Sequence, residues 1–167
     1  MLQPRSPSQE PGRTGRSPAQ PTAPVLALVA VLLLLVAGCT APTPTAGSYR
    51  DAAEQTVTDL LSAVGTGVLL VEIHRGDRAF SPYAETTAED AEDAARSIAD
   101  TFGTRQPPTA GSDALRAELS PLCDTAVNAL ADLRIALKRD DSAAVEAAGR
   151  TLRAVSSGLS DLEESLS

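Results

Sequence analysis

The chain has 167 residues with 14 basic and 22 acidic side chains, which gives a formal net charge of −8. Nucleic acids and anionic lipid headgroups are bound by basic patches, so this balance argues against both as partners. There is no Trp, and there are only two Phe and two Tyr, so the core has to be built from aliphatic residues and Ala. Such a core suits closely approaching helices better than a sheet sandwich.

Residues 1–38 have the three-part organisation of a secretory signal. A polar, Pro-rich stretch with three arginines and one acid comes first, and we expect it to be disordered. An apolar run then extends from Val25 to Ala37. As a helix this run would measure roughly 20 Å, which is shorter than the ~30 Å hydrocarbon core of a membrane. The length favours a cleaved signal helix, and the alternative is a membrane helix whose cysteine follows Gly38 by chance.

The end of this run resembles the lipobox of bacterial lipoproteins. Val36, Ala37 and Gly38 match the positions before the cleavage site, and Cys39 matches the cysteine whose thiol receives a diacylglyceryl group. The resemblance implies that Cys39 becomes the first residue of the mature chain. It also implies that palmitate-type acyl chains hold the protein at the outer, extracytoplasmic face of the cell membrane. The match covers these four residues and their apolar lead, so it says nothing about the mature domain.

The mature chain predicted by this cleavage has 167 − 38 = 129 residues, which is the size of one domain. It keeps 11 basic and 21 acidic side chains, so its net charge is about −10. Residues 39–47 form the lipidated cysteine and a flexible Pro/Thr linker with a reach of at most about 25 Å. Thirteen of the fourteen basic residues are Arg, a bias that resembles high-GC actinobacterial genomes, and the organisation of the chain resembles that of small secreted lipoproteins of actinobacteria. We expect residues 48–167 to form the folded domain.

A first helix is predicted over residues 48–75. Ser48 is followed three residues later by Asp51, which is the pattern of a capping box, and apolar residues then recur at spacings of three and four. Gly65 and Gly67 oppose a helix, because each costs about 1 kcal/mol relative to Ala. The apolar stretch after Gly67 is alternatively a strand. We favour the helix, because no second strand-like run exists to pair with it.

A second helix is predicted over residues 87–102, after a loop at residues 77–86. Its first turn carries the acidic cluster of residues 89–93, where carboxylates favour the helix dipole and stay in solvent. The cluster lacks the alternating oxygen ligands and central Gly of an EF-hand loop, so we do not expect calcium binding. The predicted buried stripe consists of Ala91, Ala94, Ala95, Ile98 and Phe102.

Two further helices are predicted over residues 113–139 and 141–166. Leucines recur at spacings of three and four in the third helix, which either kinks or restarts at Pro121. The fourth has a coiled-coil-like seam of Val145, Ala148, Leu152, Val155, Leu159, Leu162 and Leu166. The short connection between them favours an antiparallel pair. The sequence therefore predicts an all-α fold, an antiparallel up-down four-helix bundle.

Residues that carry chemistry are scarce in the predicted domain. Cys39 is used for lipid, so Cys123 has no partner for a disulfide and is expected to be a core residue. His74 is the only histidine in the chain, so a catalytic triad, a zinc site or a haem site would depend on this single side chain. The sequence has no Gly-rich phosphate loop and no Cys-x-x-Cys motif. We therefore expect no enzyme, no metal and no cofactor.

Two classes of function remain. The first is a membrane-anchored protein-interaction module that meets an unknown partner protein of the cell envelope. The second is a helical bundle that binds a small ligand, in which Gly65, Gly67, Gly149 and Gly158 leave a cavity between helices. The lipid on Cys39 would place either one at the membrane.

Overall fold

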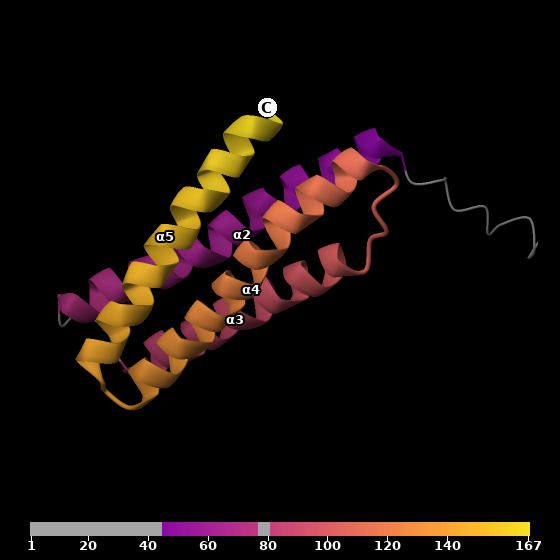
Figure 1. Cartoon of the computed structure of the whole chain (residues 1–167). Helices are drawn as coiled ribbons and strands as arrows, with labels where there is room; N and C mark the ends of the chain where they lie inside the picture. Colours follow the sequence, from indigo (N-terminus) through magenta and orange to yellow (C-terminus); the bar gives the residue numbers. More distant parts are fainter. Residues whose placement is uncertain (1–44, 77–80) are drawn as a thin grey trace, which may run out of the picture. The chain divides into compact units, whose positions relative to one another are not determined.

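A computed structural model describes residues 45–76 and 81–167, and within these ranges the chain is helical without any strand. Four helices follow one another (Figure 1): α2 (Ala46–Arg75), α3 (Ser81–Gly103), α4 (Ala110–Lys138) and α5 (Ser142–Leu166). The prediction of an all-α fold is confirmed, as is the preference for a helix after Gly67 over the alternative of a strand. The predicted signal and most of the predicted linker lie outside the described residues.

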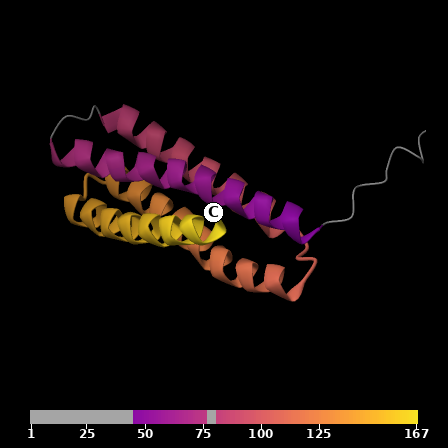
Figure 2. The ribbon, with the colours of Figure 1, turned by 90° about the horizontal axis from the view of Figure 1, so that it is seen from above.

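The four helices pack as a bundle in which α2 and α4 are central. α2 and α4 each lie against the other and against both remaining helices, whereas α3 and α5 have no Cα atoms within 8 Å of each other. Figure 2 shows α2 and α3 running alongside each other as one pair, with α4 and α5 as the other. α3 and α5 therefore lie on different sides of the contact between α2 and α4.

Two of the helices begin with the same four residues, Thr-Ala-Gly-Ser. In α2 the cap is Thr45, whose Oγ1 accepts a hydrogen bond from the Ser48 amide at 3.1 Å, while the Ser48 hydroxyl accepts one from the Thr45 amide at 3.0 Å. In α4, Thr109 Oγ1 accepts from the Ser112 amide at 3.2 Å. The predicted capping box of Ser48 and Asp51 is therefore displaced by three residues, and Ser48 is its third helical residue. The sequence reading also missed this short repeat.

α3 begins six residues earlier than predicted. The residues from Ser81 to 86 are helical rather than part of a loop. Pro82 lies in the first turn, where a residue without an amide hydrogen is tolerated. Ala84 and Ala88 extend the buried stripe toward the start of the helix, whereas Ala94, which was predicted to be buried, is exposed.

α4 runs without interruption through Pro121. Of the two predicted outcomes, a restart of the helix at this residue is wrong. A proline has no amide hydrogen to donate to the carbonyl four residues earlier in the helix. Pro121 lies on the exposed face of α4, so water can hydrate that carbonyl instead. The Thr125 hydroxyl donates a hydrogen bond to the Pro121 carbonyl at 2.6 Å.

A three-residue connection joins α4 to α5. Asp140 has a φ of 52°, a left-handed conformation that Asp adopts more readily than most residues. Asp141 is the cap of α5, and its Oδ1 accepts from the Ala144 amide at 3.0 Å. The start of the fourth helix therefore agrees with the prediction to within one residue.

The core is made of leucine, valine and alanine from all four helices. The predicted seam of α5 is confirmed in full, because each of its seven residues is buried, including Leu166 in the last turn. The only aromatic pair among the described residues is Tyr49 with Phe102, whose ring centroids lie 5.5 Å apart. The Tyr49 hydroxyl is buried without a hydrogen-bond partner among the described residues. Burial raises the pKa of this hydroxyl, so it stays protonated.

Two glycines allow α2 to approach α4 and α5 closely. A Cβ atom added at Gly67 would lie 2.6 Å from Leu130 Cδ2 of α4, and one added at Gly149 would lie 2.9 Å from Val71 Cγ1 of α2. Gly65, only two residues from Gly67, has no such neighbour within 4 Å. The conflict between these glycines and a helical α2 is therefore explained by packing at Gly67 and not at Gly65.

This difference predicts opposite effects for two alanine substitutions on the same helix. Gly67→Ala should lower the free energy of unfolding by about 1–3 kcal/mol, because the new methyl group overpacks the contact with Leu130. Gly65→Ala should raise it by up to about 1 kcal/mol through helix propensity alone. Urea unfolding followed by circular dichroism measures both. Equal effects of the two substitutions would contradict this account of the packing.

Candidate functional site

The predicted lipidation site lies outside the described residues. Val36, Ala37, Gly38 and Cys39 all precede Thr45, the first described residue. Among the described helices, α2 is the one that is long and apolar enough to cross a membrane, by length and composition alone. It is compatible with a membrane anchor, but 44% of its most apolar window is buried in the bundle and a core helix meets the same criteria. The lipid anchor on Cys39 therefore remains a prediction.

The described residues contain no group of three or more His, Cys, Asp or Glu side chains that is placed to hold a metal ion. His74 lies in the last turn of α2, as predicted. Its Nε2 atom is 3.3 Å from the hydroxyl of Ser142, the first residue of α5. The histidine thus contributes to the contact between these two helix ends.

Cys123 is a buried core residue of α4, in agreement with the prediction, and it forms no disulfide with any residue that the structure describes. Burial raises the pKa of its thiol to about 11, and the nearby Asp124 carboxylate adds to this effect. The thiolate is the reactive form of cysteine. Cys123 is therefore almost entirely in the unreactive thiol form at neutral pH.

Alkylation kinetics test the state of this thiol. In a Cys39→Ala chain, where Cys123 is the only cysteine, iodoacetamide should react far more slowly with the folded protein than with the urea-unfolded protein at pH 8. The rate for the folded protein should rise as the pH approaches 11, because ionisation follows the raised pKa. Equal rates for folded and unfolded protein at pH 8 would show that the thiol is accessible and normally ionisable.

An ion-pair cluster joins the end of α2 to the first turns of α5. The Arg75 guanidinium contacts both carboxylate oxygens of Glu146 and also donates to Glu72 at 2.8 Å. Arg153 lies 3.5 Å from the same Glu72 oxygen. The hydrogen bond from Arg75 holds the pKa of Glu146 below its usual value of 4.5. The charged form of Glu146 is thus favoured in the folded state.

This shift predicts a dependence on pH at the acid side. A carboxyl whose pKa is lower in the folded state stabilises the fold above its unfolded pKa, near 4.5, and this contribution disappears as the pH falls through the folded pKa. Glu146→Gln should therefore lower the melting temperature at pH 7, and the difference from the parent protein should shrink below about pH 4. Glu164→Gln is the control, because Glu164 is exposed and forms no ion pair among the described residues. A difference in melting temperature that persists at low pH would contradict the link between ionisation of Glu146 and stability.

Glu92 differs from the other acids of α3 because it is buried. Its side chain is 7% exposed and pairs with Arg96 of the same helix and with Arg134 of α4, where Nε lies 2.6 Å from Oε2. The prediction that the cluster at residues 89–93 stays in solvent at a helix start is therefore wrong for Glu92. Because α3 begins at Ser81, the cluster lies in the third turn, and Glu92 links α3 to α4.

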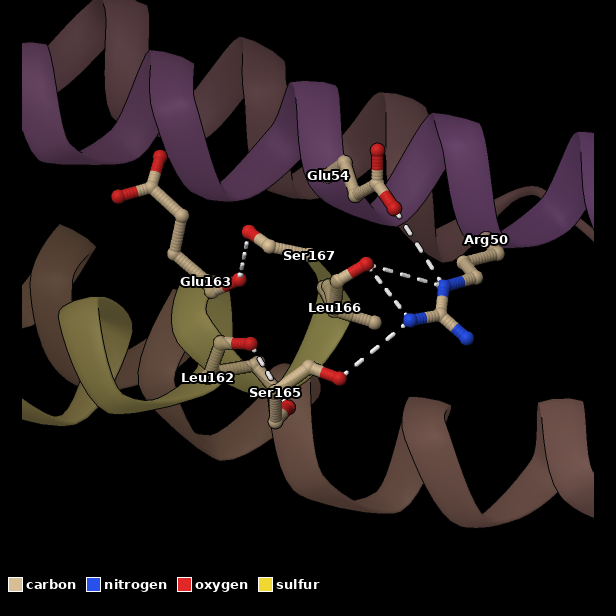
Figure 3. Close-up of polar contacts among 7 residues, drawn as sticks. All are labelled: Arg50, Glu54, Leu162, Glu163, Ser165, Leu166 and Ser167. Atoms are coloured by element: carbon tan, nitrogen blue, oxygen red, sulfur yellow. Dashed lines mark hydrogen bonds and ion pairs between the residues drawn. The ribbon is translucent and has the colours of Figure 1, made fainter.

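Arg50 holds the end of α5 against the start of α2. Figure 3 shows its guanidinium directed at the last turn of α5, where it donates to the Leu166 carbonyl at 2.6 and 3.2 Å and to the Ser165 carbonyl at 3.3 Å. Its Nε also lies 3.4 Å from Glu54. The terminal carbonyls of a helix lack intrahelical donors and carry the negative end of the helix dipole. The Arg50 guanidinium therefore supplies both hydrogen-bond donors and a favourable positive charge. The sequence analysis did not single out Arg50.

Beside Arg50 lies an open groove of about 520 Å³ between the first turns of α2 and α4 and the last turn of α5. Its lining is mainly apolar, with glycines at two helix starts and a few polar groups at the rim. The lining residues are Ala46, Gly47, Arg50, Thr109, Gly111, Ser112, Ala114, Leu115, Glu118, Leu162, Ser165 and Leu166. The repeat Thr-Ala-Gly-Ser is the sequence signal that could have drawn attention to this end of the bundle.

This groove is not the cavity that the sequence predicted. Gly67, Gly149 and Gly158 were expected to leave space between helices, but each is contacted closely by leucine or valine side chains. An added Cβ at Gly158, for example, would lie 3.0 Å from Leu122 Cδ2. Gly65 is exposed and lines no internal space. Gly67, Gly149 and Gly158 allow close packing, and none of the four glycines lines the groove.

Comparison of the chain with protein-family models, curated proteins and solved structures finds no match.

Proposed function

We propose that the protein is a lipoprotein held at the extracytoplasmic face of the cell membrane, where its helical domain acts through contacts with another envelope protein and not as an enzyme. The observation that carries this proposal is the resemblance of Val36 to Cys39 to a lipobox, directly after an apolar run of signal-peptide length. The bias toward Arg adds a resemblance to proteins of high-GC actinobacterial genomes.

The packing of the helical domain supports an interaction role. Most large apolar side chains of the described residues are buried, whereas Leu69 of α2 and Tyr83 of α3 are 58% and 68% exposed. Exposed aromatic and aliphatic side chains are common anchors in protein interfaces. In this proposal the two residues belong to the surface that meets the partner protein.

We further propose that the bundle has the antiparallel up-down arrangement. Arg50 at the start of α2 contacts the end of α5, and Arg75 at the end of α2 contacts Glu146 near the start of α5. The connection of three residues between α4 and α5 also favours this arrangement. Together these contacts support α5 running antiparallel to both α2 and α4.

A small-ligand binder is the second candidate, and one observation favours it. The groove beside Arg50 has a volume of about 520 Å³ and lies within the size range of ligand pockets. It combines apolar walls with a few polar groups at its rim, as such pockets do. This candidate would use the same membrane anchor.

Metabolic labelling with an alkyne analogue of palmitate tests the anchor. The parent chain should incorporate the label and fractionate with membranes, whereas Cys39→Ala should lose both properties, because the thiol that accepts the lipid is gone. Cys123→Ala is the matched control and should keep the label, because Cys123 is buried in the domain. Label that persists in Cys39→Ala would overturn the proposal.

A further inference from the structure

Three helices contribute apolar groups to the lining of the groove beside Arg50. Leu115 of α4 and Leu162 and Leu166 of α5 supply its largest apolar side chains. Leu162 and Leu166 are buried, and Leu115 is half-buried. An apolar surface of this kind gains free energy when another apolar group displaces water from it.

Two glycines keep the groove open at the helix starts. Gly47 of α2 and Gly111 of α4 occupy the same position of the repeat, and both line the groove. A Cβ atom at either would meet nothing closer than a threonine Oγ1 at 3.9 Å. Unlike Gly67, these glycines are not required by helix packing. A side chain at either position would occupy open space beside the groove.

The rim of the groove carries a guanidinium with spare donor capacity. Arg50 uses Nε and Nη2 for the carbonyls of α5, and Nη1 makes no hydrogen bond among the described residues (Figure 3). A guanidinium is well suited to phosphate. Glu118 also lines the groove, so its charge is mixed and not strongly cationic.

The groove lies at the start of α2, which is close in sequence to the predicted lipidation site. Ala46 and Gly47, the first two helical residues of α2, form part of its wall. Cys39 precedes Thr45 by six residues, a length that spans roughly 20 Å at full extension. With the lipid anchor proposed above, the start of α2 and the groove cannot move far from the membrane surface.

From this placement we propose that the groove takes one acyl chain of a zwitterionic phospholipid from the bilayer, with Arg50 facing the phosphate of the same lipid. The inference rests on the proposed anchor, which supplies the proximity. The net charge of about −10 on the mature chain disfavours anionic lipids, so the headgroup has no net charge. The lipid would dock the domain on the membrane, beyond what the tether alone does.

The test uses the full lipidated protein in phosphatidylcholine vesicles that contain a phosphatidylcholine with a diazirine on one acyl chain. After irradiation, peptide mapping should find lipid adducts concentrated on the segments that contain Leu115, Leu162 and Leu166. Gly111→Phe should reduce these adducts several-fold, because the ring would occupy the groove. Gly65→Phe is the matched control and should leave them unchanged, because Gly65 is a similarly open helical position outside the groove. Circular dichroism verifies that both variants are folded.

Three outcomes would overturn the inference. The first is adducts spread over the exposed surface, and the second is groove adducts that Gly111→Phe does not reduce. The third is groove adducts that form only when the diazirine is on the anchor lipid itself, which would make the anchor the occupant. The mass of the peptide that begins at Cys39 reports the anchor separately, so an absent anchor and an unoccupied groove give different results.

Discussion

The close contact of α2 with α4 and α5 is the constraint on which the rest of the bundle depends. At Gly67 the backbone of α2 lies against Leu130 and Leu152, and at Gly149 the backbone of α5 lies against Val71. A domain without Trp has little aromatic area to bury, so it gains stability from short distances between helices. Buried alanines on all four helices serve the same purpose, because their small side chains let neighbouring helices approach.

How much of this fold was predictable depends on the strength of the apolar pattern in each helix. The seam of α5 consists of leucine, valine and one alanine at regular spacing, and it was predicted residue by residue. The start of α3 was missed because Ala84 and Ala88 give a weak signal and Pro82 suggests a loop. The start of α2 was missed because Ala and Gly follow the true cap, Thr45, so that Ser48 resembled a better one.

The candidate sites also differ in how far they could be predicted from the sequence. A lipobox is contiguous in sequence, so Cys39 could be proposed as a lipidation site from its neighbours alone. The groove combines residues near positions 46, 111 and 166, and Glu92 depends on Arg134, which is 42 residues away. Such sites arise only when helices that are distant in sequence come together, and helical periodicity does not specify which helices become neighbours. The repeated Thr-Ala-Gly-Ser is visible in the sequence, but only the packing of the helices shows that both copies line the same groove.

The hydrogen bonds from Arg50 to the last turn of α5 also determine where a label on the protein would lie. Because this turn is fixed beside the start of α2, a fluorescent tag or affinity handle attached after Leu166 would sit next to the groove and close to the proposed anchor. The connection between α4 and α5 lies beside the opposite end of α2, near the pair of Arg75 and Glu146. With the anchor proposed above, an epitope inserted there would stand on the side of the domain away from the membrane.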